Sequence, residues 1–362
     1  MLNICIVAGA RPNFVKIAPL TRAITKAKVE GKSIDYKLVY AGSKEDATIE
    51  PSLFYDLEIK HPDAYLGVDC INLNELTGRV MAEFENYLET HATDVVIVVD
   101  DLASTMAAAI VTKKKGLTLA HLVAGTRSFD ISMPKEINRL VIDGLSDLLF
   151  TAGLGSNSIV SREGAELSQV YMVGNILMDT LRHNHNRLKC PEIFEEQKLE
   201  DKKYFVFTLN RKALLANEGN LASMIDALCK AAGNTKIIAA LRDNARKVIE
   251  PIANDQHNFI IIPPLSYLEF GYLTAHAMGI VTDSGNVAEE ATFNSVPCVT
   301  LNSYTEHIET VKYGSNALVG EDADKLSHAV QDIIKGTWKK CSLPDRWDGR
   351  TAERIVQILL DL

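Results

Sequence analysis

Two hydrophobic patterns alternate along the first half of the chain, and together they predict an α/β unit. Short apolar runs rich in β-branched residues lie at residues 3–9, 36–42, 94–101, 117–125, 147–153 and 170–174. These runs are almost continuously apolar, which is typical of parallel strands that are buried on both faces. The longer stretches between them, such as 15–28 and 76–91, carry apolar side chains at the spacing of an amphipathic helix.

The same alternation begins again after a polar, charged segment at residues 182–203. Its apolar runs lie at residues 204–210, 235–241, 259–263, 278–283 and 297–302. A repeated strand–helix alternation predicts two doubly wound, Rossmann-like domains that face each other across a cleft. The last segment, 347–362, has helical spacing, and Asp348–Gly349 is its expected start. Ligands of such folds bind at the carboxyl ends of the strands, so the loops at those ends are the candidates for function.

Length, charge and cysteine content narrow the possible partners. The chain has 362 residues, enough for two domains, and its formal net charge of −9 argues against a nucleic-acid partner. No apolar run approaches the ~20 residues of a membrane span, and the first residues lack the features of a signal peptide. The six cysteines are scattered and form no CxxC pair, which favours buried, reduced thiols over a metal or disulfide framework. We therefore expect a cytoplasmic protein with no membrane partner.

The loop after the first apolar run, residues 9–16, is a candidate anion site. Gly9 permits a tight turn, and Pro12 can open a helix. Arg11 and Lys16 then lie beside the helix N-terminus, where an anion can bind. Two cations at that end oppose the helix dipole unless an anion is present; the alternative is that both are simply solvated. The glycine pattern of a dinucleotide-binding loop is absent.

A second candidate anion site follows the apolar run at 278–283. Ser284, Gly285 and Asn286 present backbone N–H groups at an expected helix start, and the serine hydroxyl adds a donor. Glu290 lies further along the same helix and can contact a sugar hydroxyl. The alternative is that this glutamate only complements the helix dipole.

Charged residues mark further loops. Asp100 and Asp101 follow a strand, where they are either poised for acid–base chemistry or act as caps of the next helix. The segment 127–139 is dense in charge, as loops that carry chemistry often are. His121 lies inside an apolar run and is expected to be a satisfied core histidine rather than a base. The segment around His307 can be a helix cap followed by a polar helix start, and by itself it is weak evidence for a functional site.

Several of these segments together resemble a known family. The likeness is carried, in chain order, by GARPNFVKIAPL, SFDISMPKEINRL, VGNILMDTL, PLSYLEF, TDSGNVAEEAT, PCVTL, TEHIE and WDGRTAERI. These segments are similar to those of the non-hydrolysing UDP-N-acetylglucosamine 2-epimerases. The resemblance implies the GT-B arrangement, with an N-terminal domain at 1–174 plus a returning helix at 344–362 and a UDP-binding domain at 175–343.

The resemblance also implies an activity and a ligand. Members of the family interconvert UDP-GlcNAc and UDP-ManNAc without an external cofactor or a metal, by eliminating UDP to a 2-acetamidoglucal and adding it back with inverted C2 stereochemistry. The expected partners are therefore a UDP-sugar and, since family members are dimeric, a second copy of the chain. Arg11 and Lys16 match the family's first-loop cations, while Ser284, Gly285 and Glu290 match its phosphate and ribose contacts.

Other positions depart from the family pattern. His307 stands where the family usually has arginine, and Asn210 stands where a strand ends in a histidine beside the leaving UDP. Both are still expected to contact the UDP-sugar. Val123 and Lys135 stand where the family has two catalytic glutamates.

Two carboxylates are then assigned as catalytic. Asp101 is retained from the family's acid–base set, and Glu136 lies beside a position where a catalytic glutamate is expected. Lys135 brings a positive charge that can depress the pKa of Asp101. The sequence therefore predicts a UDP-sugar-binding member of the family with impaired epimerase activity. The alternatives are an epimerase with a rearranged acid–base set, a non-catalytic paralogue that acts as regulator or partner subunit, or a GT-B enzyme with altered nucleotide-sugar chemistry.

Overall fold

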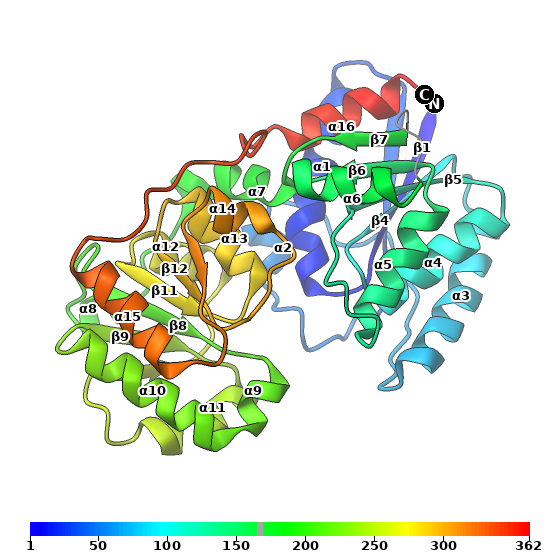
Figure 1. Ribbon diagram of the computed structural model, residues 1–362. Helices are drawn as coiled ribbons and strands as arrows, with labels where there is room; N and C mark the ends of the chain where they lie inside the picture. Colours follow the sequence, from blue (N-terminus) through cyan, green and yellow to red (C-terminus); the bar gives the residue numbers. More distant parts are fainter. Residues whose placement is uncertain (165–168) are drawn as a thin grey trace. The chain divides into compact units, whose positions relative to one another are not determined.

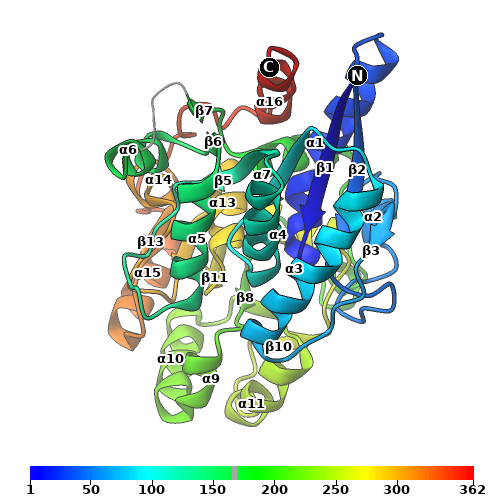
Figure 2. The ribbon, with the colours of Figure 1, turned by 90° about the vertical axis from the view of Figure 1, so that its right-hand side faces the viewer.

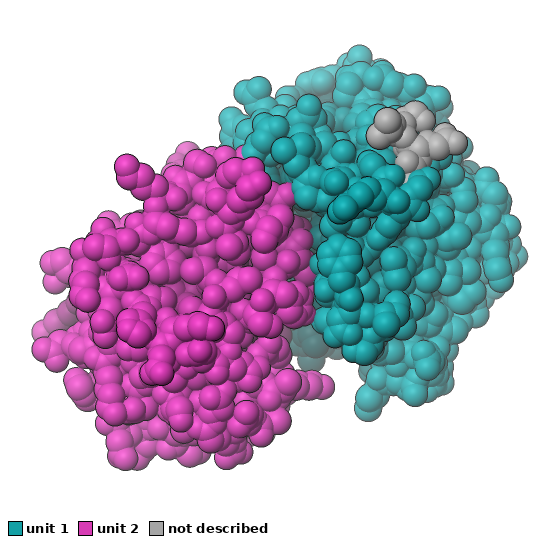
Figure 3. Space-filling view, in the orientation of Figure 1, with its two compact units in different colours: residues 1–183, 345–362 teal, residues 184–344 magenta. Residues whose placement is uncertain are grey.

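The computed structural model describes residues 1–164 and 169–362. The chain forms two compact units, Met1–His183 with Asp345–Leu362 and Asn184–Pro344, which are coloured separately in Figure 3. Each unit is built on its own parallel sheet with helices packed against it (Figure 1). The predicted α/β class with two Rossmann-like sheets is confirmed.

The first unit holds a seven-stranded sheet in the order β3-β2-β1-β4-β5-β6-β7. Its strands are β1 (Leu2–Ala8), β2 (Ile34–Tyr40), β3 (Ala64–Tyr65), β4 (Val95–Val99), β5 (Thr118–Ala124), β6 (Leu148–Thr151) and β7 (Val170–Met172). All neighbouring strands run parallel. All the apolar runs predicted for this unit are confirmed as strands. β3 was missed because two residues are too few to show a hydrophobic pattern.

Helices connect these strands and cover both faces of the sheet. They are α1 (Arg11–Val29), α2 (Leu53–Asp56), α3 (Leu73–Thr90), α4 (Ala103–Lys114), α5 (Pro134–Leu145), α6 (Leu154–Arg162), α7 (Ile176–Asn184) and α16 (Thr351–Leu360). Because parallel crossovers are right-handed, the change of direction at β1 and β4 puts α1 on one face and α4 and α5 on the other. α1 packs against α16, and α4 packs against α3 and α5 (Figures 1 and 2). That change of direction is where ligands bind in such sheets.

The last helix packs on the first unit. The Trp347 side chain is 1% exposed, and its ring N–H donates to a backbone carbonyl of this unit. α16 begins at Thr351, and the expected start at Asp348–Gly349 is therefore wrong. The carboxylate of Asp179, from α7, accepts the N–H groups of Thr351 (3.1 Å) and Ala352 (2.8 Å). This cap fixes the first helical turn two residues beyond the glycine.

Helix α7 belongs to the first unit, which shifts the boundary between the units along the chain. The hydroxyl of Thr180 donates to the carbonyl of Val15 at 2.6 Å and ties α7 to α1. The chain therefore leaves the first unit after His183, whereas residue 174 was the expected end. Sequence periodicity carries no signal for this contact because it joins two helices that lie far apart along the chain.

Asp179 makes the stability of this unit depend on pH. Burial raises the pKa of its carboxyl to about 6, which outweighs the two backbone N–H groups that favour the anion. A group whose pKa is higher in the folded chain stabilises the fold while it is protonated, and this contribution is lost as the pH rises through about 6. Between pH ~3 and ~7, wild type should lose about 3 kcal/mol more unfolding free energy than Asp179→Asn. Urea denaturation along this pH series measures the difference, and parallel curves for the two proteins would contradict it.

The second unit holds a six-stranded parallel sheet in the order β10-β9-β8-β11-β12-β13. Its strands are β8 (Tyr204–Thr208), β9 (Lys236–Ala240), β10 (Phe259–Ile262), β11 (Gly279–Thr282), β12 (Cys298–Thr300) and β13 (Asn316–Leu318). Its helices are α8 (Ile193–Glu196), α9 (Lys212–Ala216), α10 (Glu218–Ala232), α11 (Asp243–Ala253), α12 (Tyr267–Ala275), α13 (Gly285–Phe293), α14 (Ile308–Lys312) and α15 (Ala323–Ile334). The predicted runs of this half are confirmed as strands, and only the short β13 was missed.

Burial follows the hydrophobic pattern in both sheets. Every residue of β4 and of β8 is buried, as expected for strands covered on both faces. Cys5, Cys229 and Cys298 are buried thiols as predicted, but Cys190 is exposed, so the prediction of buried cysteines is wrong there. Among residues 1–164 and 169–362, no helix combines the length and the apolar character that crossing a membrane requires.

Candidate functional site

The loop from β1 into α1 is a sharp turn held by one side chain. The side-chain oxygen of Asn13 accepts the N–H groups of Gly9 (2.8 Å) and Ala10 (3.3 Å). α1 begins at Arg11, and the buried Lys16 lies in its second turn. The predicted strand–turn–helix is confirmed, and both predicted cations stand near the start of the helix.

Each of these cations has an acidic partner. Lys16 Nζ lies 2.6 Å from Asp100 Oδ1, with side chains only 8% and 16% exposed. The guanidinium of Arg11 pairs with the carboxylate of Glu50, where the side chains are 21% and 30% exposed. The alternative in which both cations are merely solvated is therefore wrong. Glu50 carried no signal in the sequence because it lies in a loop remote from the first strand.

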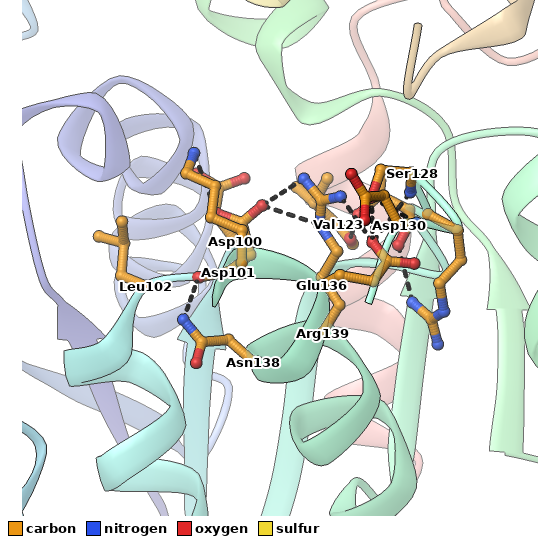
Figure 4. A network of polar contacts seen from close by, with 12 residues as sticks. Asp100, Asp101, Leu102, Val123, Ser128, Asp130, Glu136, Asn138 and Arg139 are labelled. Carbon is orange, nitrogen blue, oxygen red and sulfur yellow. Dashed lines mark hydrogen bonds and ion pairs between the residues drawn. The ribbon is translucent and has the colours of Figure 1, made fainter. Parts of the chain in front are cut away.

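The two aspartates after β4 do not cap the helix that follows them. The residue before α4 is Leu102, and the carboxylate of Asp101 instead accepts hydrogen bonds from α5 (Figure 4). Asp100 has a φ of +59°, in the left-handed region, which aspartate tolerates better than most residues. The capping alternative is wrong, and both carboxylates are held by basic side chains.

Arg139 of α5 joins the two carboxylates that the sequence assigned as catalytic (Figure 4). It donates from Nε (2.8 Å) and Nη2 (2.5 Å) to Asp101 Oδ2, and from Nη1 (3.0 Å) to Glu136 Oε2. Lys135 Nζ lies 3.4 Å from Asp101 Oδ1. Burial opposes the ionisation of Asp101, but the charges of Lys135 and Arg139 outweigh it and lower the pKa of this carboxyl.

Glu136 holds the loop that precedes its own helix. Its carboxylate accepts the backbone N–H groups of Ser128 (2.9 Å) and Phe129 (3.0 Å) and the hydroxyl of Ser128 (2.9 Å). Burial raises the pKa of Glu136, but these bonds and the one from Arg139 outweigh it, so the pKa is lowered. The side chain is 3% exposed. This geometry favours a positioning role for Glu136 over proton transfer.

Val123 adopts a backbone conformation that valine rarely accepts. Its φ is +74°, and the register between β5 and β6 shifts between Leu122 and Ala124. A β-branched residue in the left-handed region is a steric outlier, so the surrounding fold, and not valine, sets this conformation. Such outliers cluster at functional sites. At residue 123, β5 thus has the unusual backbone that is typical of functional sites, but the valine side chain cannot exchange a proton.

His121 is a core histidine, as predicted. Its side chain is 1% exposed, with Nδ1 2.6 Å from Asp143 Oδ1 and Nε2 2.9 Å from the carbonyl oxygen of Asp100. Asp143 also pairs with Arg127 Nη1 at 2.7 Å. The cluster therefore links β5 to α5, and it holds the turn after β4 through the contact of His121 with the carbonyl of Asp100.

Sequence reasoning missed Asp143, although a signal for it exists. Glu136, Arg139 and Asp143 are spaced by three and four residues, which places all three on one face of a helix. That face is buried, because all three residues are less than one-tenth exposed. Three charged residues on one buried helix face indicate a polar network, since isolated buried charges are rare.

In the second unit, Asp283 orders the turn after β8. Its Oδ2 accepts the N–H groups of Asn210 (2.9 Å) and Arg211 (2.6 Å). Arg211 Nη1 donates to Asn302 Oδ1 at 3.0 Å. The turns after β8, β11 and β12 are thereby joined at the carboxyl edge of this sheet, and Asn210 is exposed there. Sequence reasoning missed the role of Arg211, which depends on the order of the strands.

Ser284 and Gly285 start helix α13, as predicted. Ser284 is the N-cap, and its hydroxyl oxygen lies 3.5 Å from the N–H of Val287. A Cβ placed on Gly285 would meet no described atom within 4 Å. The N-terminus of α13 is therefore open to an approaching anion.

Glu290 lies on this helix, and His307 lies beside it. Glu290 is on α13 and is 9% exposed. His307 precedes α14, and its Nε2 lies 3.2 Å from the oxygen of the neighbouring Glu289, which is 2% exposed. The residues predicted for the second unit thus gather around the carboxyl ends of β8, β11 and β12, and those predicted for the first unit around β1, β4 and β5.

Comparison with known proteins points to one family. Residues 26–360 match the family described as UDP-N-acetylglucosamine 2-epimerase. The UDP-N-acetylglucosamine 2-epimerase of Methanocaldococcus jannaschii is 32% identical over 99% of this chain and 99% of its own. A UDP-N-acetylglucosamine 2-epimerase homolog of Methanococcus maripaludis is 33% identical over 100% of both chains. A crystal structure of the Methanocaldococcus jannaschii enzyme with UDP-GlcNAc and UDP has a TM-score of 0.86, at 31% identity over 100% of both chains.

Proposed function

The chain belongs to the UDP-N-acetylglucosamine 2-epimerase family, and on that basis we propose that it binds a UDP-N-acetylhexosamine but has lost most of the family's 2-epimerase activity. The proposed binding needs no external cofactor. The residues proposed to contact it are Arg11, Lys16, Asn210, Ser284, Gly285, Glu290 and His307. Binding, the first part, and impaired proton transfer, the second, rest on different observations.

Each unit has features that suit a bound anion, and these features support the proposed binding of a UDP-sugar. In the first unit, Arg11 and Lys16 stand in the first turns of α1. In the second unit, Ser284 begins α13, and Gly285 leaves its N-terminus open. Helix N-termini and cations at the carboxyl ends of parallel strands suit the two phosphates of UDP. The similar Methanocaldococcus jannaschii enzyme crystallises with UDP-GlcNAc and UDP.

The lowered pKa of Asp101 is the observation that supports impaired proton transfer, the second part. Removing the proton at C2 of the sugar needs a base whose pKa lies near the working pH. Lys135 at 3.4 Å and Arg139 at 2.5 Å hold the pKa of Asp101 below its ordinary value, against the effect of burial, which makes this carboxylate a weak base. The loss of one general acid or base typically costs ~10²–10⁴-fold in rate.

Two side chains that differ from the family pattern also favour a loss of epimerase activity. Val123 is an aliphatic residue where the resemblance expects a carboxylate, so no group there can exchange a proton. Asn210 can donate a hydrogen bond to a phosphate oxygen but carries no charge. Charged donors make hydrogen bonds about twice as strong as neutral ones, so asparagine stabilises a departing UDP less well than a protonated histidine.

Calorimetric titration with UDP-GlcNAc, combined with chromatographic detection of UDP-ManNAc, tests both parts. The Methanocaldococcus jannaschii enzyme, measured in parallel, is the active reference. We expect saturable binding and a turnover at least ~10²-fold below the reference. Absence of binding would overturn the first part, and turnover equal to the reference would overturn the second.

A further inference from the structure

A sheltered ion pair lies where the first loop meets the end of β4. Lys16 Nζ is 2.6 Å from Asp100 Oδ1, with side chains 8% and 16% exposed. Asn13 Nδ2 donates to the other oxygen of Asp100 at 2.9 Å. The pair between Arg11 and Glu50 in the same loop is more exposed, at 21% and 30%, so solvent screens it more strongly. Of the two acids, Asp100 therefore holds its cation more firmly.

The backbone of Asp100 is anchored independently of its carboxylate. The N–H of Asp100 donates to the carbonyl of Leu122 at 3.2 Å, and its carbonyl oxygen lies 2.9 Å from His121 Nε2. Both contacts come from β5, the neighbouring strand. The backbone that carries this carboxylate is thus fixed by the sheet beside Lys16, while the side chain itself can still rotate.

We infer that Asp100 is a specificity-determining residue, an internal counter-ion that competes with the negatively charged groups of a ligand for Lys16. The inference rests on the proposed function, in which Lys16 contacts the UDP-sugar. A phosphate that approaches Lys16 must share this ammonium group with the aspartate or displace the aspartate from it. Asp100 therefore weakens the binding of diphosphate ligands, and a ligand has to supply further contacts to bind.

Two substitutions remove this charge without disturbing the turn. Asp100→Asn keeps the shape of the side chain, and asparagine tolerates the left-handed region well. Asp100→Gly removes the side chain, and glycine adopts a φ of +59° at no steric cost. Both retain the backbone contacts to β5. Asp35→Asn is the matched control, since it removes the same charge from the exposed pair that Lys28, also on α1, makes at 2.6 Å.

Calorimetric titration of these variants with UDP-GlcNAc, and separately with inorganic pyrophosphate, tests the inference. We expect both Asp100 variants to bind UDP-GlcNAc about tenfold more tightly than wild type, the size of one hydrogen bond to a charged group. Their affinity should fall more steeply with added salt, because an unneutralised cation now meets the phosphates. Asp35→Asn should behave as wild type. Adding Lys16→Met to Asp100→Asn should remove the gain.

The outcomes separate this inference from the proposed function. If Asp100→Asn binds UDP-GlcNAc no better than wild type, or worse, Asp100 does not compete for Lys16, and the inference is overturned. If no variant binds UDP-GlcNAc but Asp100→Asn gains affinity for pyrophosphate, the proposed function fails and the competition by Asp100 stands. If no variant binds either probe, both are overturned.

Discussion

Replacing the buried Arg139 by methionine should lower the free energy of unfolding by about 3–5 kcal/mol. Arg139 is 1% exposed and neutralises Asp101 and Glu136, which are 11% and 3% exposed. Without it, Asp101 keeps its pair with Lys135, which is weaker because that side chain is 57% exposed and 3.4 Å away, and Glu136 loses the charge of Arg139. Breaking a buried pair by removing one partner is costly because a charge is left uncompensated. Urea denaturation followed by circular dichroism measures the loss.

An exposed arginine in the same unit is the matched control. Arg79→Met breaks a helix-surface pair with Glu75, whose side chains are 62% and 51% exposed, and should cost less than ~1 kcal/mol. Adding Asp101→Asn and Glu136→Gln to Arg139→Met should recover part of the loss, since no buried charge is then left unpaired. Equal losses for Arg139→Met and Arg79→Met would show that the buried network does not stabilise the fold.

Restoring three side chains together should have the largest effect on activity. The variant Val123→Glu, Lys135→Glu and Asn210→His is expected to raise UDP-ManNAc formation at least ~10²-fold, the contribution of one general acid or base. Glutamate has no branch at Cβ, so it fits the φ of +74° at residue 123 with less strain than valine. The change at residue 135 also removes the ammonium group that lies 3.4 Å from Asp101. Chromatography of the sugar nucleotides follows the reaction.

A control variant with side chains of similar size distinguishes an effect of proton transfer from an effect of side-chain shape. Val123→Gln, Lys135→Gln and Asn210→Gln introduces side chains of similar size that cannot transfer a proton, and it should give no gain. Unfolding curves and UDP-GlcNAc titrations show whether each variant is folded and binds. If the restored variant folds and binds UDP-GlcNAc yet forms no more UDP-ManNAc than wild type, the replaced side chains are not the limiting defect.

The fold was largely predictable because strands buried on both faces leave a clear apolar signature. β4, predicted within 94–101, spans Val95–Val99, and β8, predicted within 204–210, spans Tyr204–Thr208. β3 and β13 were missed because two or three residues are too short for a pattern. The placement of α7 was missed because it depends on a tertiary contact from Thr180, which sequence periodicity does not encode.

The loops that hold the candidate residues were predictable from the sequence, but the partners of these residues were not. Loops at the carboxyl ends of the strands pointed to Lys16 and to Asp101. The pairing of Lys16 with Asp100 joins residues 84 positions apart and depends on β1 and β4 lying side by side. The conformation of Val123 could not be foreseen at all, because valine by itself predicts the opposite backbone region.

Hydrogen–deuterium exchange at C2 of the sugar tests the proposed loss of proton transfer most directly. Wild-type protein is incubated with UDP-GlcNAc in D₂O, and the C2 proton signal is followed by NMR beside the Methanocaldococcus jannaschii enzyme. The expected result is saturable binding of UDP-GlcNAc while the C2 proton persists long after the reference enzyme has exchanged it. Deuterium entering C2 as fast as in the reference, with UDP-ManNAc appearing, would contradict the proposed function.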